Sequence, residues 1–250
     1  MSGVSFLYVT SPDDKSEAFK KMRRKHVQEA SEFDDNFYLT QIFNYLSDTY
    51  NNFTDTCRNA LKQKKEEEIT DYVRRQLQNN EDFVLDGFKV NSEARNQDKV
   101  VGYYDLKFEN GDWLNQYLVL ECKPINNTKS RIDAYIHKTI KSQEESNECE
   151  DGGLYRFLIN KYATHKPFGG MLGYIISSNP QNTIDSIKKK IQTLQITQEN
   201  LCFGDLQNSE LLDATIKNFN YSFQSNHVRI YEGQIIAPIH IFHLFYDLTQ

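Results

Sequence analysis

Closely spaced cysteines are absent from this 250-residue chain, which has four cysteines far apart in the sequence. No pair has the short spacing of a zinc clamp or a redox motif, so we expect reduced, structural thiols. Glycine and proline are also scarce, at 11 and 5 residues, and no tract is of low complexity. These absences favour an ordinary globular protein and exclude disulfide-rich and repetitive classes.

Long apolar runs are missing as well. No stretch approaches the ~20 apolar residues that span a bilayer, and residues 1–10 lack the basic lead and apolar length of a signal peptide. We therefore expect a cytoplasmic protein without membrane contact. The net charge of −6 argues against a surface built throughout for nucleic acid, although it leaves room for a local basic cleft.

Aromatic residues are plentiful, with 16 Phe and 15 Tyr, so a core can form without disulfides. Residues 35–62 repeat apolar side chains at steps of three and four, which predicts a helix with one buried stripe. We interpret residues 1–62 as a helical N-terminal appendage and residues 63–250 as the main domain. Packing of the appendage onto the domain is favoured over binding a partner, which stays open.

The order of elements after residue 62 predicts an α/β fold. Residues 62–77 read as an amphipathic helix, and a hairpin turn is expected at Asn110-Gly111. The end of the chain is ambiguous: residues 227–236 suit a hairpin, and residues 237–248 suit either a strand or a helix. The other expected elements are strands at 83–94, 99–108 and 116–123, a helix at 128–145, a strand at 169–177 and a helix at 180–196.

Charged residues interrupt two of these strands. Glu121 and Lys123 alternate with apolar residues and therefore share one face, while Asp105 interrupts the preceding strand. Both strands are apolar on both faces, so these charges are costly unless they are paired or bind a metal. A pair of structural ion pairs is the plainer alternative for Asp105 and Glu121, and an exit lysine before Pro124 is the alternative for Lys123.

The residue types suit phosphodiester chemistry. Two carboxylates are hard oxygen ligands for Mg²⁺, and the backbone carbonyl of Cys122 is a further candidate ligand. A lysine beside them can orient a water or neutralise charge in the transition state. Partial burial is expected to lower the pKa of Lys123 toward the working range, so that it can also accept a proton.

Asp105 followed by Glu121-Cys122-Lys123 resembles the catalytic signature of the PD-(D/E)xK nuclease superfamily, and the order helix, three strands, helix, strand over about residues 63–177 resembles its core. The resemblance implies a restriction-endonuclease-like core, with a mixed sheet flanked by helices. It also implies Mg²⁺ or Mn²⁺ dependence and hydrolysis of nucleic acid, DNA rather than RNA, in restriction or other defence. Tyr104 replaces the proline of the signature, but proline contributes no ligand.

Many members of the superfamily add a carboxylate from the helix before the sheet. Glu66 falls on the apolar face of the helix over 62–77 and is the first candidate, with Glu68 and Glu93 as alternatives. A solvated glutamate in an acidic run is an equally good interpretation of Glu66. The helix after the lysine often lines the substrate cleft in this superfamily. Three residues there share one helix face and are candidates for phosphate contact, although a solvated helix face is the favoured interpretation: Arg131, Tyr135 and Lys138.

Rival functions remain. A catalytically inactive nucleic-acid-binding or scaffold subunit can retain the same fold, and an interaction protein can use the N-terminal helices. A homodimer is plausible for an enzyme that cuts both strands. Lys188–Lys190 and the histidines His227, His240 and His243 are more typical of solvated and structural positions than of a site.

Overall fold

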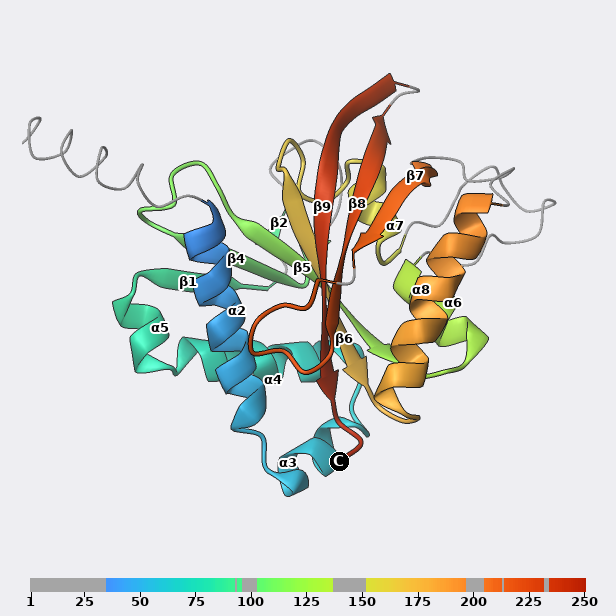
Figure 1. The fold of residues 1–250 in the computed structure, drawn as a ribbon. Coiled ribbons are helices and arrows are strands. Elements are labelled where there is room, and N and C mark those ends of the chain that lie inside the picture. Colours follow the sequence, from blue (N-terminus) through green and yellow to red (C-terminus); the bar gives the residue numbers. More distant parts are fainter. Residues whose placement is uncertain are drawn as a thin grey trace, which may run out of the picture.

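The computed structural model describes residues 35–92, 94–95, 103–136, 152–196, 205–212, 214–231 and 234–250. They form an α/β fold around a seven-stranded mixed sheet in the order β1-β4-β5-β6-β9-β8-β7 (Figure 1). The α/β class expected from the sequence is therefore confirmed. The strands are β1 Phe88–Asn91, β4 Leu106–Asn110, β5 Leu118–Ile125, β6 Phe168–Ile175, β7 Asp205–Leu212, β8 Ser222–Tyr231 and β9 Gln234–Asp247, with β2 Ala94–Arg95 and β3 Tyr103–Tyr104 in a separate pair.

Helices cover both faces of the sheet. Helices α2 to α5 share one hydrophobic cluster with one face, and α6 to α8 contribute to the cluster on the other face (Figure 1). No helix in the described part of the chain is long and apolar enough to cross a membrane. The helices are α2 Asp35–Asn51, α3 Asp55–Leu61, α4 Glu66–Gln78, α5 Glu81–Leu85, α6 Lys129–Ile136, α7 Tyr155–Leu158 and α8 Pro180–Ile196.

The central strands run in mixed directions. Strand β5 pairs antiparallel with β4 and parallel with β6, and β6 is also parallel to β9. Every residue of β6 is buried, as expected for a central parallel strand covered on both faces. The predicted turn at Asn110-Gly111 joins β4 to β5, where the Asn110 side chain accepts a hydrogen bond from the Asp112 amide.

The region over 35–62 is two helices rather than the one predicted. Thr54 caps the second helix by accepting a hydrogen bond from the amide of Cys57. A new helix therefore begins there instead of a continuation of α2. Leu39, Ile42 and Leu46 of α2 belong to the same core cluster as the sheet. Residues 35–61 therefore pack against the main domain, as favoured from the sequence. Residues 1–34 lie outside the described part of the chain.

The predicted strand over 83–94 is wrong in its first half. Asn80 caps a short helix there by accepting a hydrogen bond from the amide of Phe83, and β1 begins only at Phe88. Gly87, at a φ of 80°, makes the turn between helix and strand. In so short a segment, the pattern of apolar residues does not distinguish a helix from a strand. Phe83 is buried in the observed helix, as it would be expected to be in a strand.

The C-terminal region is a hairpin of two long strands. Strands β8 and β9 pair antiparallel from Ser222 opposite Leu244 to Tyr231 opposite Gln234. The predicted hairpin is confirmed, and residues 237–247, which suited either structure, belong to a strand. On its other side β9 pairs with β6, so the last strand of the chain lies inside the sheet, between β6 and β8 (Figure 1).

Candidate active site

Strands β4 and β5 separate a few residues away from the turn that joins them. Their pairing ends at Leu106 opposite Leu120. Asp105 stands at a bend just before β4, not within a strand as predicted. Its Oδ2 accepts a hydrogen bond of 2.7 Å from the amide of Cys122. A carboxylate thus takes the place that a strand backbone would otherwise occupy.

Beyond Leu120, the backbone groups on one side of β5 have no partner in β4. The N–H and C=O of one strand residue point to the same side, so the carbonyl of Cys122 is directed toward Asp105. Pro124 shares this direction, because alternate residues do. Proline has no N–H to donate, so its place at an edge without a strand partner is physically reasonable. The predicted Cys122 carbonyl ligand therefore faces the candidate site.

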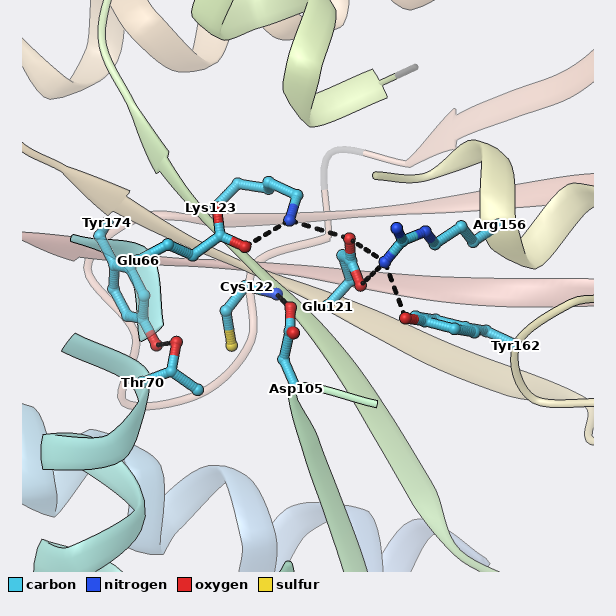
Figure 2. A network of polar contacts seen from close by, with 9 residues as sticks. All are labelled: Glu66, Thr70, Asp105, Glu121, Cys122, Lys123, Arg156, Tyr162 and Tyr174. Atoms are coloured by element: carbon cyan, nitrogen blue, oxygen red, sulfur yellow. Dashed lines mark hydrogen bonds and ion pairs between the residues drawn. The ribbon is translucent and has the colours of Figure 1, made fainter. Parts of the chain in front are cut away.

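Four of the predicted residues meet at this edge. Glu121 and Lys123 lie on the sheet face toward α7, whereas Glu66 is the first residue of α4 on the opposite face. The Nζ of Lys123 lies 2.5 Å from Oε1 of Glu66 and 3.0 Å from Oε1 of Glu121 (Figure 2). The structure therefore brings Glu66, Glu121 and Lys123 into direct contact beside Asp105.

Glu68, the first alternative to Glu66, makes its contacts at the start of the helix. Glu68 accepts a hydrogen bond from the amide of Lys65 and pairs with Lys64 at 3.0 Å, as the N3 residue of a capping box. These contacts lower the pKa of Glu68. Glu93 lies outside the described residues. Among the described candidates, Glu66 is thus the helix carboxylate that reaches the lysine.

Burial and crowding of carboxylates raise the pKa of Asp105 to about 8. Desolvation is the largest cause, and the charge of Glu121 adds to it, against the opposing effects of Lys123 and the Cys122 amide. Burial also raises the pKa of Glu66, opposed by Lys123. At neutral pH Asp105 is therefore mostly protonated in the metal-free protein, which limits the negative charge held beside Lys123.

The expectation of a lowered lysine pKa is wrong. Burial does act to lower the pKa of Lys123, but the charges of Glu121, Glu66 and Asp105 together outweigh it and raise the pKa above its ordinary value. The ammonium group is held by two carboxylate contacts. Lys123 is therefore protonated at neutral pH and is a hydrogen-bond donor, not a proton acceptor.

Two residues that the sequence did not single out complete the network. Nη1 of Arg156, from α7, lies 3.0 and 3.1 Å from the two carboxylate oxygens of Glu121 and donates to the hydroxyl of Tyr162 at 2.7 Å (Figure 2). Arg156 is 35 positions from Glu121 in the sequence. No spacing or periodicity links the two, so only the fold reveals the contact.

An acid-lined pocket of about 300 Å³ opens beside Asp105 and Glu66. Carboxylate oxygens are the ligands that Mg²⁺ prefers, which fits the chemistry of this lining. Among the described residues, no group of three or more His, Cys, Asp or Glu side chains is arranged to hold a metal ion as it stands. The pocket is lined by Glu66, Glu67, Glu68, Thr70, Asp71, Ser92 and Asp105.

The helix predicted to line a substrate cleft is only partly suited to it. Arg131 is exposed on α6, but Tyr135 is fully buried and its hydroxyl lies 3.0 Å from Nδ1 of His243. The prediction that Tyr135 contacts phosphate is therefore wrong, because the apolar stripe of α6 includes its ring. Lys138 lies outside the described residues, and Lys190 of the basic cluster pairs with Asp133 at 2.9 Å.

A second buried polar network lies between α6 and the C-terminal hairpin. Oγ of Ser225 lies 2.6 Å from Nε2 of His227 and 2.8 Å from Nε2 of His243, whose other ring nitrogen meets Tyr135. All four side chains are buried. The structural interpretation of these histidines is thus supported by their hydrogen bonds.

Comparisons with known proteins add nothing to this geometry. No family model, no curated protein and no solved structure matches the chain. The chemistry of the site therefore has to be argued from its own residues.

Proposed function

We propose that this chain is a divalent-metal-dependent nuclease that hydrolyses phosphodiester bonds, in DNA rather than RNA. The observation that carries the proposal is the meeting of Glu66, Asp105, Glu121 and Lys123 at the edge of β5, beside an acid-lined pocket. Apart from the short elements α5, β2, β3 and α7, the order α4, β1, β4, β5, α6, β6 supports a PD-(D/E)xK, restriction-endonuclease-like core. A role in defence against foreign DNA follows from that resemblance alone.

A divalent metal is part of this proposal. The donors available to Mg²⁺ or Mn²⁺ are the carboxylates of Asp105 and Glu66 at the pocket and the carbonyl of Cys122. Glu121, the other carboxylate expected to bind the metal, is held by Arg156. When bound, such an ion polarises the phosphodiester and lowers the pKa of a bound water. The raised pKa of Asp105 supports this fit, because a cation placed there would offset both the burial of its charge and the repulsion from Glu121.

Lys123 has a separate task in this proposal. Its ammonium group carries charge toward the position of the scissile phosphate and donates hydrogen bonds to it, which offsets negative charge that develops in the transition state. Glu66 and Glu121 hold the ammonium group from two sides and limit its rotamers. The attacking water must then be deprotonated by a group other than Lys123.

A scaffold subunit without catalysis is the second candidate. The observation that favours it is the ion network itself: both oxygens of Glu121 are engaged by Arg156, and one of them also by Lys123. Such a closed network can serve as a structural element without any ion. Binding of nucleic acid without cleavage, at any metal concentration, would be its signature.

Cleavage assays separate these candidates. The wild type is incubated with single- and double-stranded DNA, linear and circular, and with RNA, in Mg²⁺, Mn²⁺ or EDTA. Asp105→Ala and Lys123→Ala are tested beside Asp82→Ala and Lys89→Ala, which remove the same charges from exposed positions. Metal-dependent cutting that only the first pair abolishes is the expected result. Cutting that survives Asp105→Ala and Lys123→Ala, or no cutting of any substrate, contradicts the proposal.

A further inference from the structure

Arg156 binds Glu121, the most buried carboxylate of the candidate site. Glu121 is 0% exposed, and its two oxygens receive the same guanidinium nitrogen of Arg156. A buried carboxylate with no cation would be very costly, so this contact offsets its charge. Lys123 shares Oε1 of Glu121, so Arg156 also limits where the ammonium group of Lys123 can lie (Figure 2).

The segment around Arg156 is closely fitted to the core. Gly153 has a φ of 51°, and a Cβ there would lie 2.0 Å from the carbonyl oxygen of Tyr135. A Cβ on Gly169 of β6 would lie 2.5 Å from the ring of Phe157. Only glycine at these two positions lets the turn of α7 lie against α6 and β6. The short helix that carries Arg156 is therefore packed closely against both elements.

A second arginine secures the other end of this segment. Arg229 of β8 is 1% exposed, and its Nη1 donates to the carbonyl of Ala163 at 3.1 Å. The carbonyl of Arg156 accepts hydrogen bonds from the amides of Lys161 and Tyr162 at 2.9 and 3.0 Å. The Tyr162 hydroxyl then returns to Nη1 of Arg156. The loop after α7 thus closes on Arg156 and is attached to the C-terminal hairpin.

We infer that Arg156 is a positioning residue of this site and the cation that keeps Glu121 from serving as a metal ligand. Through Glu121 it holds Lys123 beside Glu66, ready for a phosphate. The inference rests on the proposed function for its effect on turnover, but its effect on metal binding is independent of cleavage. Removing the charge of Arg156 should therefore change metal affinity and turnover in opposite directions.

The two effects have opposite signs. Loss of the guanidinium charge leaves Glu121 free to join Asp105 and Glu66, so the affinity for Mn²⁺ rises, by about tenfold for one charge removed at close range in a partly screened site. Turnover falls, by about tenfold or more, because Lys123 is no longer fixed against Glu121. A residue with a merely structural role would instead lower affinity, turnover and stability together.

Calorimetry with Mn²⁺ tests the inference. Arg156→Gln removes the charge, Arg156→Lys keeps it, and Lys89→Gln removes a charge from an exposed position on β1. Circular dichroism and thermal melts accompany each variant, since Glu121 is buried and Arg156→Gln is expected to lower stability. Arg156→Lys is expected to keep affinity near the wild-type value, which makes it informative if Arg156→Gln does not fold.

The outcomes are distinct from those of the cleavage assay. Tighter Mn²⁺ binding in Arg156→Gln, with wild-type affinity in Arg156→Lys and Lys89→Gln, supports the inference even if the protein cuts no nucleic acid. Equal or weaker binding in a folded Arg156→Gln overturns it, even if the wild type is an active nuclease. Binding to Arg156→Lys that is as tight as binding to a charge-free variant, or no Mn²⁺ binding by any variant, also overturns it.

Discussion

The amide of Cys122 donates its hydrogen bond to the carboxylate of Asp105 instead of to a neighbouring strand. This contact lies where β4 and β5 stop pairing, so it explains how a mostly apolar sheet opens an edge to polar side chains. Residues from both faces of the sheet, Glu66 on one and Glu121 on the other, then reach Lys123. The bend at Asp105 thus interrupts the strand pairing and leaves room for the polar side chains of the candidate site.

Asp105→Asn should change how stability depends on pH in the metal-free protein. The pKa of Asp105 is about 8 when folded, against an ordinary value of about 4 in an unfolded chain. Between these values the folded state holds the proton and the unfolded state does not. The free energy of unfolding therefore falls as pH rises through that window, by up to about 1.4 kcal/mol per pH unit from this group.

Urea unfolding in EDTA at pH 5, 6.5 and 8 measures this effect. Asparagine keeps an oxygen for the Cys122 amide and does not ionise, so the variant should gain on the wild type as pH rises. The same titrations of Asp82→Asn, an exposed acid on α5, control for the substitution itself. Parallel stability curves for wild type and Asp105→Asn would show that Asp105 ionises normally in the fold.

Glu66 and Glu68 offer a matched pair, because both stand in the first turn of α4. Glu66→Gln removes the charge that contacts Lys123 at 2.5 Å, and we expect loss of cleavage by about tenfold or more because the lysine is no longer held from that side. Glu68→Gln perturbs the cap of the helix and one wall of the pocket but no contact of Lys123, and it should leave cleavage near the wild-type rate. Initial rates in saturating Mg²⁺ measure both, and equal losses would contradict the assignment of Glu66.

The sequence predicts the candidate site better than it predicts the segments around it. Asp105, Glu121 and Lys123 stand out because charges in apolar strands are costly, and Glu66 follows from the period of its helix. Arg156 carries no such signal, since it lies in a four-residue helix whose position depends on Gly153 and on β6.

Two errors have the same physical origin. The sequence shows that Tyr135 and Arg131 are near each other on a helix, but not that the face of Tyr135 packs inward. It also shows that Lys123 is partly buried, but not that Glu66 and Glu121 surround it and raise its pKa. Long-range contacts decide both properties, and local periodicity does not contain them.

Gly153→Ala should destabilise the fold and disturb Arg156. A Cβ at this position would lie 2.0 Å from a backbone oxygen of Tyr135, at a φ of 51° that side chains rarely adopt. We expect a loss of about 2 kcal/mol or more in the free energy of unfolding. Gly111→Ala is the control, since nothing lies within 4 Å of a Cβ there. Chemical denaturation of both variants gives the comparison, and an equal effect on stability would refute the role of Gly153.

The buried histidines should make the protein sensitive to acid. Burial lowers the pKa of His227 to about 3 and lowers that of His243 as well, against about 6.5 in an unfolded chain. Below pH 6.5 the unfolded state therefore binds more protons than the folded state, and stability falls as the pH decreases. Each such histidine contributes up to about 1.4 kcal/mol per pH unit until the folded pKa is reached.

His227→Gln isolates this contribution. A glutamine amide reaches about as far as the Nε2 atom that meets Ser225, so the variant keeps a polar partner there but cannot take up a proton. At pH 7 the substitution should cost about 1 to 2 kcal/mol for imperfect packing and hydrogen bonding. At pH 5 this cost should shrink or reverse, because only in the wild type is the unfolded state stabilised by taking up a proton at position 227. His165→Gln, at an exposed position, is the control, and a cost for His227→Gln that stays constant from pH 7 to pH 5 would show that His227 is not buried in its neutral form.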